Sequence, residues 1–100
     1  MTLIIAGTVR VPPEHVEGLR PHMLEMREAT RAEVGCQIYG YAEDVGEPGL
    51  IHVFEVWDDQ ASLDAHIASP HMATWRAAGA RYGVHGRALT AYEVASSRPL

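Results

Sequence analysis

The sequence predicts an α+β domain with a ferredoxin-like order of elements, β-α-β-β-α-β: an antiparallel sheet with helices on one face. Segments rich in β-branched and aromatic residues alternate along the chain with segments whose apolar residues have helical spacing. The two central strand-like segments, 36–44 and 50–58, are joined only by a short turn containing VGEPG. Such a short connection predicts a hairpin between them.

The first half of the chain predicts a strand followed by a helix. Residues 2–11 are mostly apolar or β-branched, which is typical of a buried strand. The letters PPEH begin a helix that runs to about residue 32, because proline and an acidic residue favour its first turn. Its buried stripe is Val16, Leu19, Met23, Met26 and Thr30. Pro21 lies inside this helix and is expected to kink or split it.

The second half predicts two helical segments and a last strand. Asp58 or Asp59 caps a helix over 60–68, and Ser69-Pro70 ends it and begins another over 70–82. Residues 85–95 form the last strand. A single domain over 1–95 and a loose tail over 96–100 follow from this division.

The predicted sheet has too many apolar residues for one covered face. In the third strand Leu50, Phe54 and Val56 point to one side, while Ile51, Val53 and Trp57 point to the other. The helices of a chain this short cover only one face, and an open face is normally polar. We therefore expect a homodimer in which the partner covers the open sheet face.

Composition excludes several classes of partner. A net charge of −5, with eight scattered basic residues, disfavours nucleic acid and anionic membranes as partners. The N-terminal apolar stretch lacks a basic leader segment, and no stretch reaches transmembrane length. Cys36 is the single cysteine and has no basic neighbour, which fits a cytoplasmic location and argues against a nucleophile. The phosphate-binding glycine motifs and the GxSxG motif do not occur, so neither a nucleotide cofactor nor serine hydrolysis is predicted.

Glu55, His66 and His71 are the candidate catalytic residues. Glu55 lies within an apolar strand, where a carboxylate must be paired, hydrogen-bonded or protonated. It is either a general base or a structural partner of His66, Arg87 or a helix end. His66, at the edge of a buried helical stripe, is its expected partner, and His71 begins the next helical segment.

No metal site is predicted from the histidines. Metal binding on one helix requires i, i+4 spacing, whereas His66 and His71 are five residues apart with a proline between them. Neither a cysteine pair nor a carboxylate cluster stands nearby in the sequence. Of the remaining histidines, His15 and His22 are expected on the surface. His52 and His85 could face either a cavity or solvent.

Aromatic and methionine side chains are candidates for a substrate pocket. Most such residues pack in a core, but together they also suit a flat phenolic or quinone ligand. The candidates for substrate binding are Trp57, Tyr39, Trp75, Met23 and Met72.

Two stretches, AEVGCQIYGYAED and HVFEVWDDQASLDAHIASPHMATW, resemble the antibiotic biosynthesis monooxygenase-like domains of the dimeric α+β barrel superfamily. The resemblance covers essentially the whole chain. Its motif residues are Glu33, Gly35 and Cys36; Glu55 and Trp57; Ala65 and His66; and Ser69 and His71.

The resemblance implies two sheets back to back in a homodimer, with an apolar cavity between sheet and helices. It also implies oxidation of a phenol, anthrone or quinol by molecular oxygen without metal or flavin. Other members degrade haem with an Asn, a Trp and a His. Haem degradation is disfavoured here because Ala6-Gly7 stands where the Asn would fall, His66 near the Trp position and Arg76 near the His position. Two alternatives remain beside the monooxygenase: a non-catalytic dimer that binds a small hydrophobic ligand, and a lactone isomerase or cyclase-like enzyme.

Overall fold

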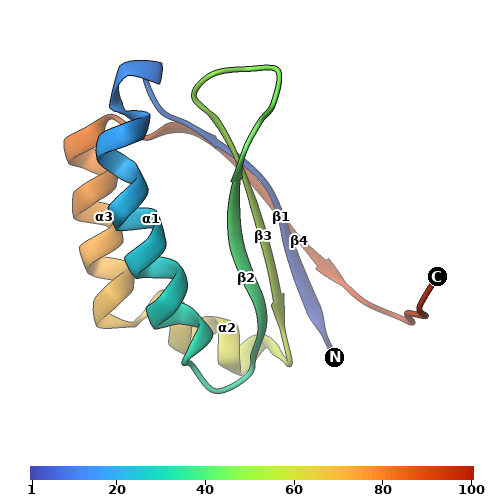
Figure 1. Ribbon diagram of the computed structural model, residues 1–100. Coiled ribbons are helices and arrows are strands. Elements are labelled where there is room, and N and C mark those ends of the chain that lie inside the picture. The colour runs from blue at the N-terminus through green and yellow to red at the C-terminus, as the bar shows by residue number, and fades with distance from the viewer.

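The computed structural model describes residues 1–100 and has the predicted α+β fold. The elements are β1 (Leu3–Arg10), the 3-10 turn η1 (Pro13–His15), α1 (Val16–Arg31), β2 (Cys36–Glu43), β3 (Leu50–Trp57), α2 (Gln60–Ile67), α3 (Pro70–Tyr82) and β4 (His85–Glu93). The strands form one antiparallel sheet in the order β2-β3-β1-β4. All three helices lie on the same side of this sheet (Figure 1). The ferredoxin-like prediction is confirmed.

Helix α1 passes through Pro21 without a break, so the expected split of this helix is wrong. Pro21 and Glu17, the residue one turn before it, are both exposed. The carbonyl of Glu17, which Pro21 cannot bond, therefore faces water instead of the core. A proline on the solvent side of a helix is tolerated for this reason.

The junction between α2 and α3 is fixed by capping residues. The Asp59 carboxylate accepts a hydrogen bond from the Ser62 backbone N–H at 2.8 Å and so caps α2. Ser69 accepts from the Met72 backbone N–H at 3.2 Å and donates to the His66 carbonyl at 2.7 Å. Pro70 then occupies the first turn of α3. This tight turn brings the end of α2 and the start of α3 together.

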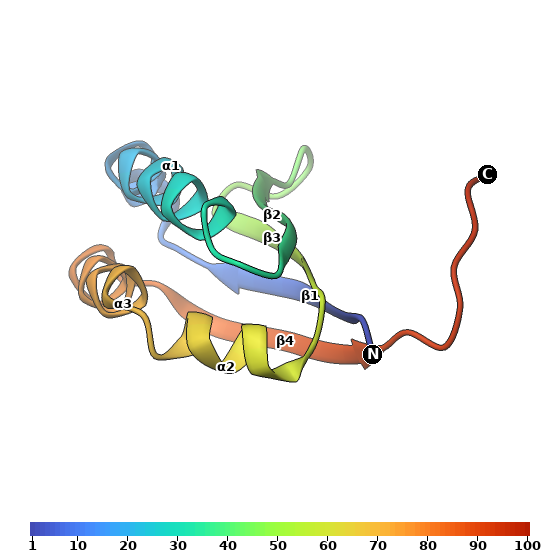
Figure 2. The same ribbon diagram turned by 90° about the horizontal axis from the view of Figure 1, so that it is seen from below.

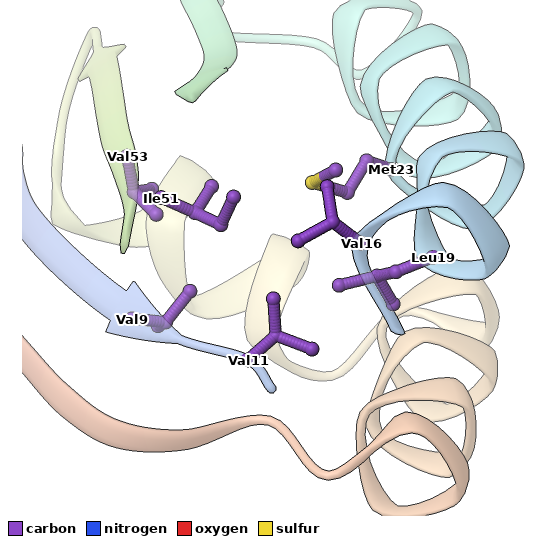
Figure 3. Packing of buried hydrophobic residues seen from close by; sticks show 7 residues of the cluster. All are labelled: Val9, Val11, Val16, Leu19, Met23, Ile51 and Val53. Atoms are coloured by element: carbon purple, nitrogen blue, oxygen red, sulfur yellow. The ribbon is translucent and has the colours of Figure 1, made fainter. Parts of the chain in front are cut away.

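The core lies between the sheet and α1. Leu19 is fully buried at the centre of a cluster that joins α1 to β1 and β3. Figure 3 shows its members: Val9, Val11, Val16, Leu19, Met23, Ile51 and Val53. A second cluster lies toward the other end of the sheet, around the fully buried Trp57, and includes Leu3, Ile5, Met26, Tyr39 and Leu63.

The face of the sheet without helices is apolar, as the sequence predicted. Ile38, Phe54 and Tyr92 lie on it with 46%, 43% and 53% of their surface exposed. The strand register puts Ile4 between Val56 and Tyr92, which makes the apolar area continuous from β3 to β4. None of the helices combines the length and apolar character needed to span a membrane.

Candidate active site

The largest cavity of the molecule lies between the sheet and the helices α2 and α3, and its volume is about 840 Å³. In Figure 2 these two helices lie on the side of the molecule where β4 forms the edge of the sheet. Most of the cavity wall is apolar, with Ile5, Val53, Leu63, Met72 and Leu89 among its residues. A volume of several hundred Å³ with an apolar wall is typical of small-molecule sites.

Glu33, His66 and His71 form a hydrogen-bonded group beside this cavity. One oxygen of Glu33, Oε2, lies 2.7 Å from His66 Nδ1 and 2.9 Å from His71 Nε2. Glu33 follows the end of α1, His66 comes from α2 and His71 from the first turn of α3. A carboxylate accepts hydrogen bonds, so both imidazoles donate to it. This network assigns the His66 proton to Nδ1.

The second nitrogen of His66, Nε2, lies buried within the protein. His66 lines the cavity, only 1% of the residue is exposed, and its Nε2 makes no hydrogen bond. With the proton on Nδ1, Nε2 carries a lone pair. A cavity-lining imidazole that is held by a carboxylate and keeps a free lone pair has the chemistry of a general base.

The expected pair of Glu55 and His66 is wrong. Glu55 accepts a hydrogen bond from the indole N–H of Trp57 at 2.9 Å, and the partner of His66 is Glu33. Glu55 and Trp57 are two residues apart on β3 and therefore share a face. Burial raises the pKa of the Glu55 carboxyl, while the Trp57 hydrogen bond and the charges of His66 and Arg87 oppose the rise. Glu55 lines the cavity as the sequence predicted.

Tyr39 and Tyr41 contribute a second polar group to the cavity wall. Their hydroxyl oxygens are 2.7 Å apart, and both side chains line the cavity. Burial raises the pKa of both hydroxyls well above the usual range for tyrosine, so both keep their protons. One hydroxyl donates to the other, which leaves one O–H free to donate to a ligand.

The remaining predicted residues divide between the cavity and the core. Tyr39, Trp75 and Met72 line the cavity, whereas Met23 and Trp57 do not. Met23 packs in the core between α1 and the sheet, and Trp57 lies behind His66 with the two ring centres 4.8 Å apart. His71 does not line this cavity either, since it lies beyond Glu33.

Glu33 was not predicted as a site residue, although its motif contains the signal. Gly35, two residues later, has a φ of +84°, and a Cβ there would lie 2.1 Å from Ser62 Oγ. Only glycine permits this conformation together with such close contact to α2. The contact brings the turn after α1 against α2, and so brings Glu33 to His66.

Glu33, His66 and His71 are the group of side chains that could hold a metal ion. The prediction of no metal site rested on the spacing of the two histidines and did not include Glu33. Their donor atoms all lie within 4.8 Å of one another. Ligand atoms bound at about 2.0–2.2 Å around a tetrahedral ion are roughly 3.4 Å apart. The separations of 2.7 and 2.9 Å are shorter and match hydrogen bonds. In the absence of an ion, protons therefore lie between these atoms.

A buried histidine held by a carboxylate, in the wall of an apolar cavity, is an arrangement suited to binding a small molecule. The sequence profile of the antibiotic biosynthesis monooxygenase family matches residues 2–78. The chain belongs to this family.

Two curated relatives have a similar sequence. One is the uncharacterized protein sll1783 of Synechocystis, 33% identical over 69% of this chain and 47% of its own length. The other, YcnE of Bacillus subtilis, is provisionally described as a monooxygenase and is 27% identical over 77% of this chain and 81% of its own length. The match thus spans about half the length of the first relative and most of the second.

Solved structures agree over almost the whole chain. A protein of Deinococcus radiodurans, provisionally described as an antibiotic biosynthesis monooxygenase, superposes with a TM-score of 0.89 at 29% identity, covering 100% of this chain and 98% of that one. Rv0793 of Mycobacterium tuberculosis superposes with a TM-score of 0.82 at 26% identity, covering 99% and 100%.

Proposed function

We propose that this protein is a cofactor-independent monooxygenase that oxidises a small phenol, anthrone or quinol with molecular oxygen in the 840 Å³ cavity. The observation that carries the proposal is the state of His66. Its Nδ1 is held by Glu33, its Nε2 is buried and unpaired, and its side chain is part of the cavity wall. The monooxygenase-like role agrees with the family to which the chain belongs.

In this proposal His66 Nε2 takes the proton of the substrate hydroxyl or of its acidic C–H. The imidazolium that results is stabilised by the carboxylate of Glu33, at 2.7 Å from Nδ1. The free O–H of the Tyr39–Tyr41 pair donates to the oxygen of the substrate anion. Glu55, next to the apolar wall, orients the substrate through its carboxyl group.

The substrate supplies every electron that the reaction needs. The deprotonated, electron-rich ring passes one electron to O₂, and the radical pair recombines with formation of a C–O bond. Proton return from His66 gives a hydroperoxide. Loss of water then breaks the O–O bond and leaves a carbonyl, so that R₂CH₂ and O₂ become R₂C=O and H₂O. The apolar wall keeps water from the anion before oxygen reacts.

Oxygen consumption with a panel of hydroquinones, naphthols and anthrones tests the proposal. We expect uptake with at least one compound, and at least a hundredfold lower kcat in His66→Asn because general-base catalysis contributes about 10²–10⁴-fold. His22→Asn is the control, since His22 is a partly buried histidine of α1 outside the cavity wall. Full activity in His66→Asn refutes the role of His66.

Absence of uptake with every compound, together with measurable binding, would instead favour the non-catalytic ligand-binding protein. Turnover without oxygen consumption would favour the isomerase or cyclase-like reaction. Both alternatives use the same cavity, so the oxygen electrode separates chemistry from binding.

We further propose that the open sheet face is the interface of a homodimer. Ile38, Phe54 and Tyr92 on that face are about half exposed in the single chain, and large apolar patches mark interaction surfaces. Sedimentation at micromolar concentration should give the mass of a dimer, and Phe54→Arg should give a monomer. A wild-type monomer at that concentration contradicts the proposal.

A further inference from the structure

The carboxylate of Glu33 has no arginine to balance its charge. Its side chain is only 16% exposed, and both of its ion-pair partners are histidines, His66 and His71. The arginines that form ion pairs use other carboxylates. A largely buried carboxylate is normally paired with a cation or bound to a metal ion. Within contact distance of Glu33, only a protonated imidazole or a bound metal ion supplies the positive charge.

The donor atoms of this group have the spacing of neighbouring ligands on an octahedral ion. Metal–ligand bonds of about 2.0–2.2 Å at right angles separate adjacent ligand atoms by roughly 2.8–3.1 Å, whereas a tetrahedral ion needs roughly 3.4 Å. Glu33 Oε2 lies 2.7 Å from His66 Nδ1 and 2.9 Å from His71 Nε2, and all three atoms lie within 4.8 Å of one another. An octahedral ion therefore requires little change in the two separations that involve Glu33.

The group is open to the surface on the side of His71. The side chain of His71 is 25% exposed, whereas that of His66 is almost fully buried. His71 also lines a recess of about 20 Å³ between α1 and α3, together with His22 and Glu25. A space of this size holds one water molecule. The recess offers an ion a route from solvent and room for water on a free coordination position.

We infer that Glu33, His66 and His71 bind a divalent transition-metal ion that favours octahedral coordination, such as Ni²⁺ or Co²⁺. Two imidazoles and one carboxylate suit these ions better than Mg²⁺ or Ca²⁺, which prefer oxygen ligands.

The bound ion and the base of the proposed function exclude each other. An ion on His66 Nδ1 leaves the proton of the neutral imidazole on Nε2, which then has no lone pair. Nε2 has no protein partner in either form, so this tautomer sacrifices no hydrogen bond. The exclusion rests on the proposed function, whereas the binding of the ion does not.

Titration calorimetry with Ni²⁺ on the metal-free, untagged full chain tests the binding. We expect a single ion per chain to bind at micromolar concentration, and Mg²⁺ not to bind in the same range. His71→Asn and Glu33→Gln, checked for folding by circular dichroism, should each weaken Ni²⁺ binding by at least about tenfold, since even indirect partners of metal ligands contribute about 10–100-fold. Co²⁺ should show the weak visible bands of an octahedral ion.

His52→Asn is the matched control, because His52 bonds the Asp44 carboxylate at 2.8 Å on the surface and is a second histidine–carboxylate pair. Unchanged affinity in His71→Asn and Glu33→Gln, or an equal loss in His52→Asn, would place the ion elsewhere and overturn the assignment. The intense bands of tetrahedral Co²⁺ would overturn the octahedral geometry. Absence of Ni²⁺ binding at millimolar concentration overturns the inference and leaves the proposed function intact.

Oxygen uptake tests the exclusion of base and ion. Ni²⁺ should inhibit uptake at the concentration that fills the site, and His71→Asn should need at least about tenfold more Ni²⁺ for the same inhibition. Uninhibited uptake by the Ni²⁺-loaded protein overturns the exclusion. Absence of uptake in the metal-free protein, with Ni²⁺ binding intact, counts against the proposed function and leaves the metal site standing.

Discussion

Replacement of Glu33 by Gln tests whether this carboxylate acts through His66. Glutamine keeps the shape of the side chain and one acceptor oxygen, but it removes the negative charge. Hydrogen bonds to charged groups contribute about 1.5–3 kcal/mol and neutral ones about 0.5–1.5 kcal/mol, so each bond weakens by about 1 kcal/mol or slightly more. Glu33 accepts two such bonds, and we expect a loss of about 2 kcal/mol in the free energy of unfolding.

The same change should lower kcat by about tenfold, because about 1.4 kcal/mol of stabilisation of the protonated His66 is lost. His71→Asn is the comparison, since it removes one of the two donors and leaves the bond between Glu33 and His66. It should cost about 1 kcal/mol of stability and change kcat by less than threefold. Urea unfolding and initial rates of oxygen uptake measure both effects. An unchanged kcat in Glu33→Gln, or an equal loss in His71→Asn, refutes the reasoning.

Three further predictions concern the fold around the site. Gly7→Ala should prevent folding or lower the free energy of unfolding, measured with urea, by more than about 3 kcal/mol. The reason is that a Cβ there would lie 1.9 Å from the Ala88 carbonyl oxygen. Gly40→Ala is the control and should be tolerated, because a Cβ at Gly40 meets nothing within 4 Å. Ser69→Ala should cost about 1 kcal/mol by the same measurement, through loss of the cap of α3; a neutral effect contradicts this role. For Glu55 the folded-state pKa is raised, so the folded protein loses stability relative to the unfolded chain as the pH rises through the unfolded-state pKa toward the folded-state pKa. Glu55→Gln should therefore gain stability relative to wild type between pH 4 and pH 7 in paired urea titrations, and a gap that stays constant or narrows rules out the raised pKa.

The fold could be predicted from the sequence because its signals are local. The strand and helix periods, the caps Asp59 and Ser69, and the short turn between β2 and β3 each depend on neighbouring residues. Pro21 failed as a signal because its effect depends on which side of α1 faces solvent, and that is decided by packing.

The candidate site could be predicted only in part. His66 and Glu55 could be identified as site residues because they are polar residues among apolar neighbours. Their hydrogen-bond partners could not be identified from the sequence. Glu33 is 33 residues from His66 in the chain and reaches it only because Gly35 lets the turn after α1 contact α2. Glu55 meets Trp57 instead, since the two share a face of β3. A long-range pair depends on the path of a loop, which single-sequence patterns do not determine.

The unpaired Nε2 of His66 has a consequence for ligand selectivity. No protein group donates to this buried atom. Under the proposed function, a ligand hydroxyl at that position supplies the donor, whereas a methyl group of similar size leaves the atom without one, at a cost of about 1–3 kcal/mol. We therefore expect a phenol to bind more tightly than its methyl-substituted analogue.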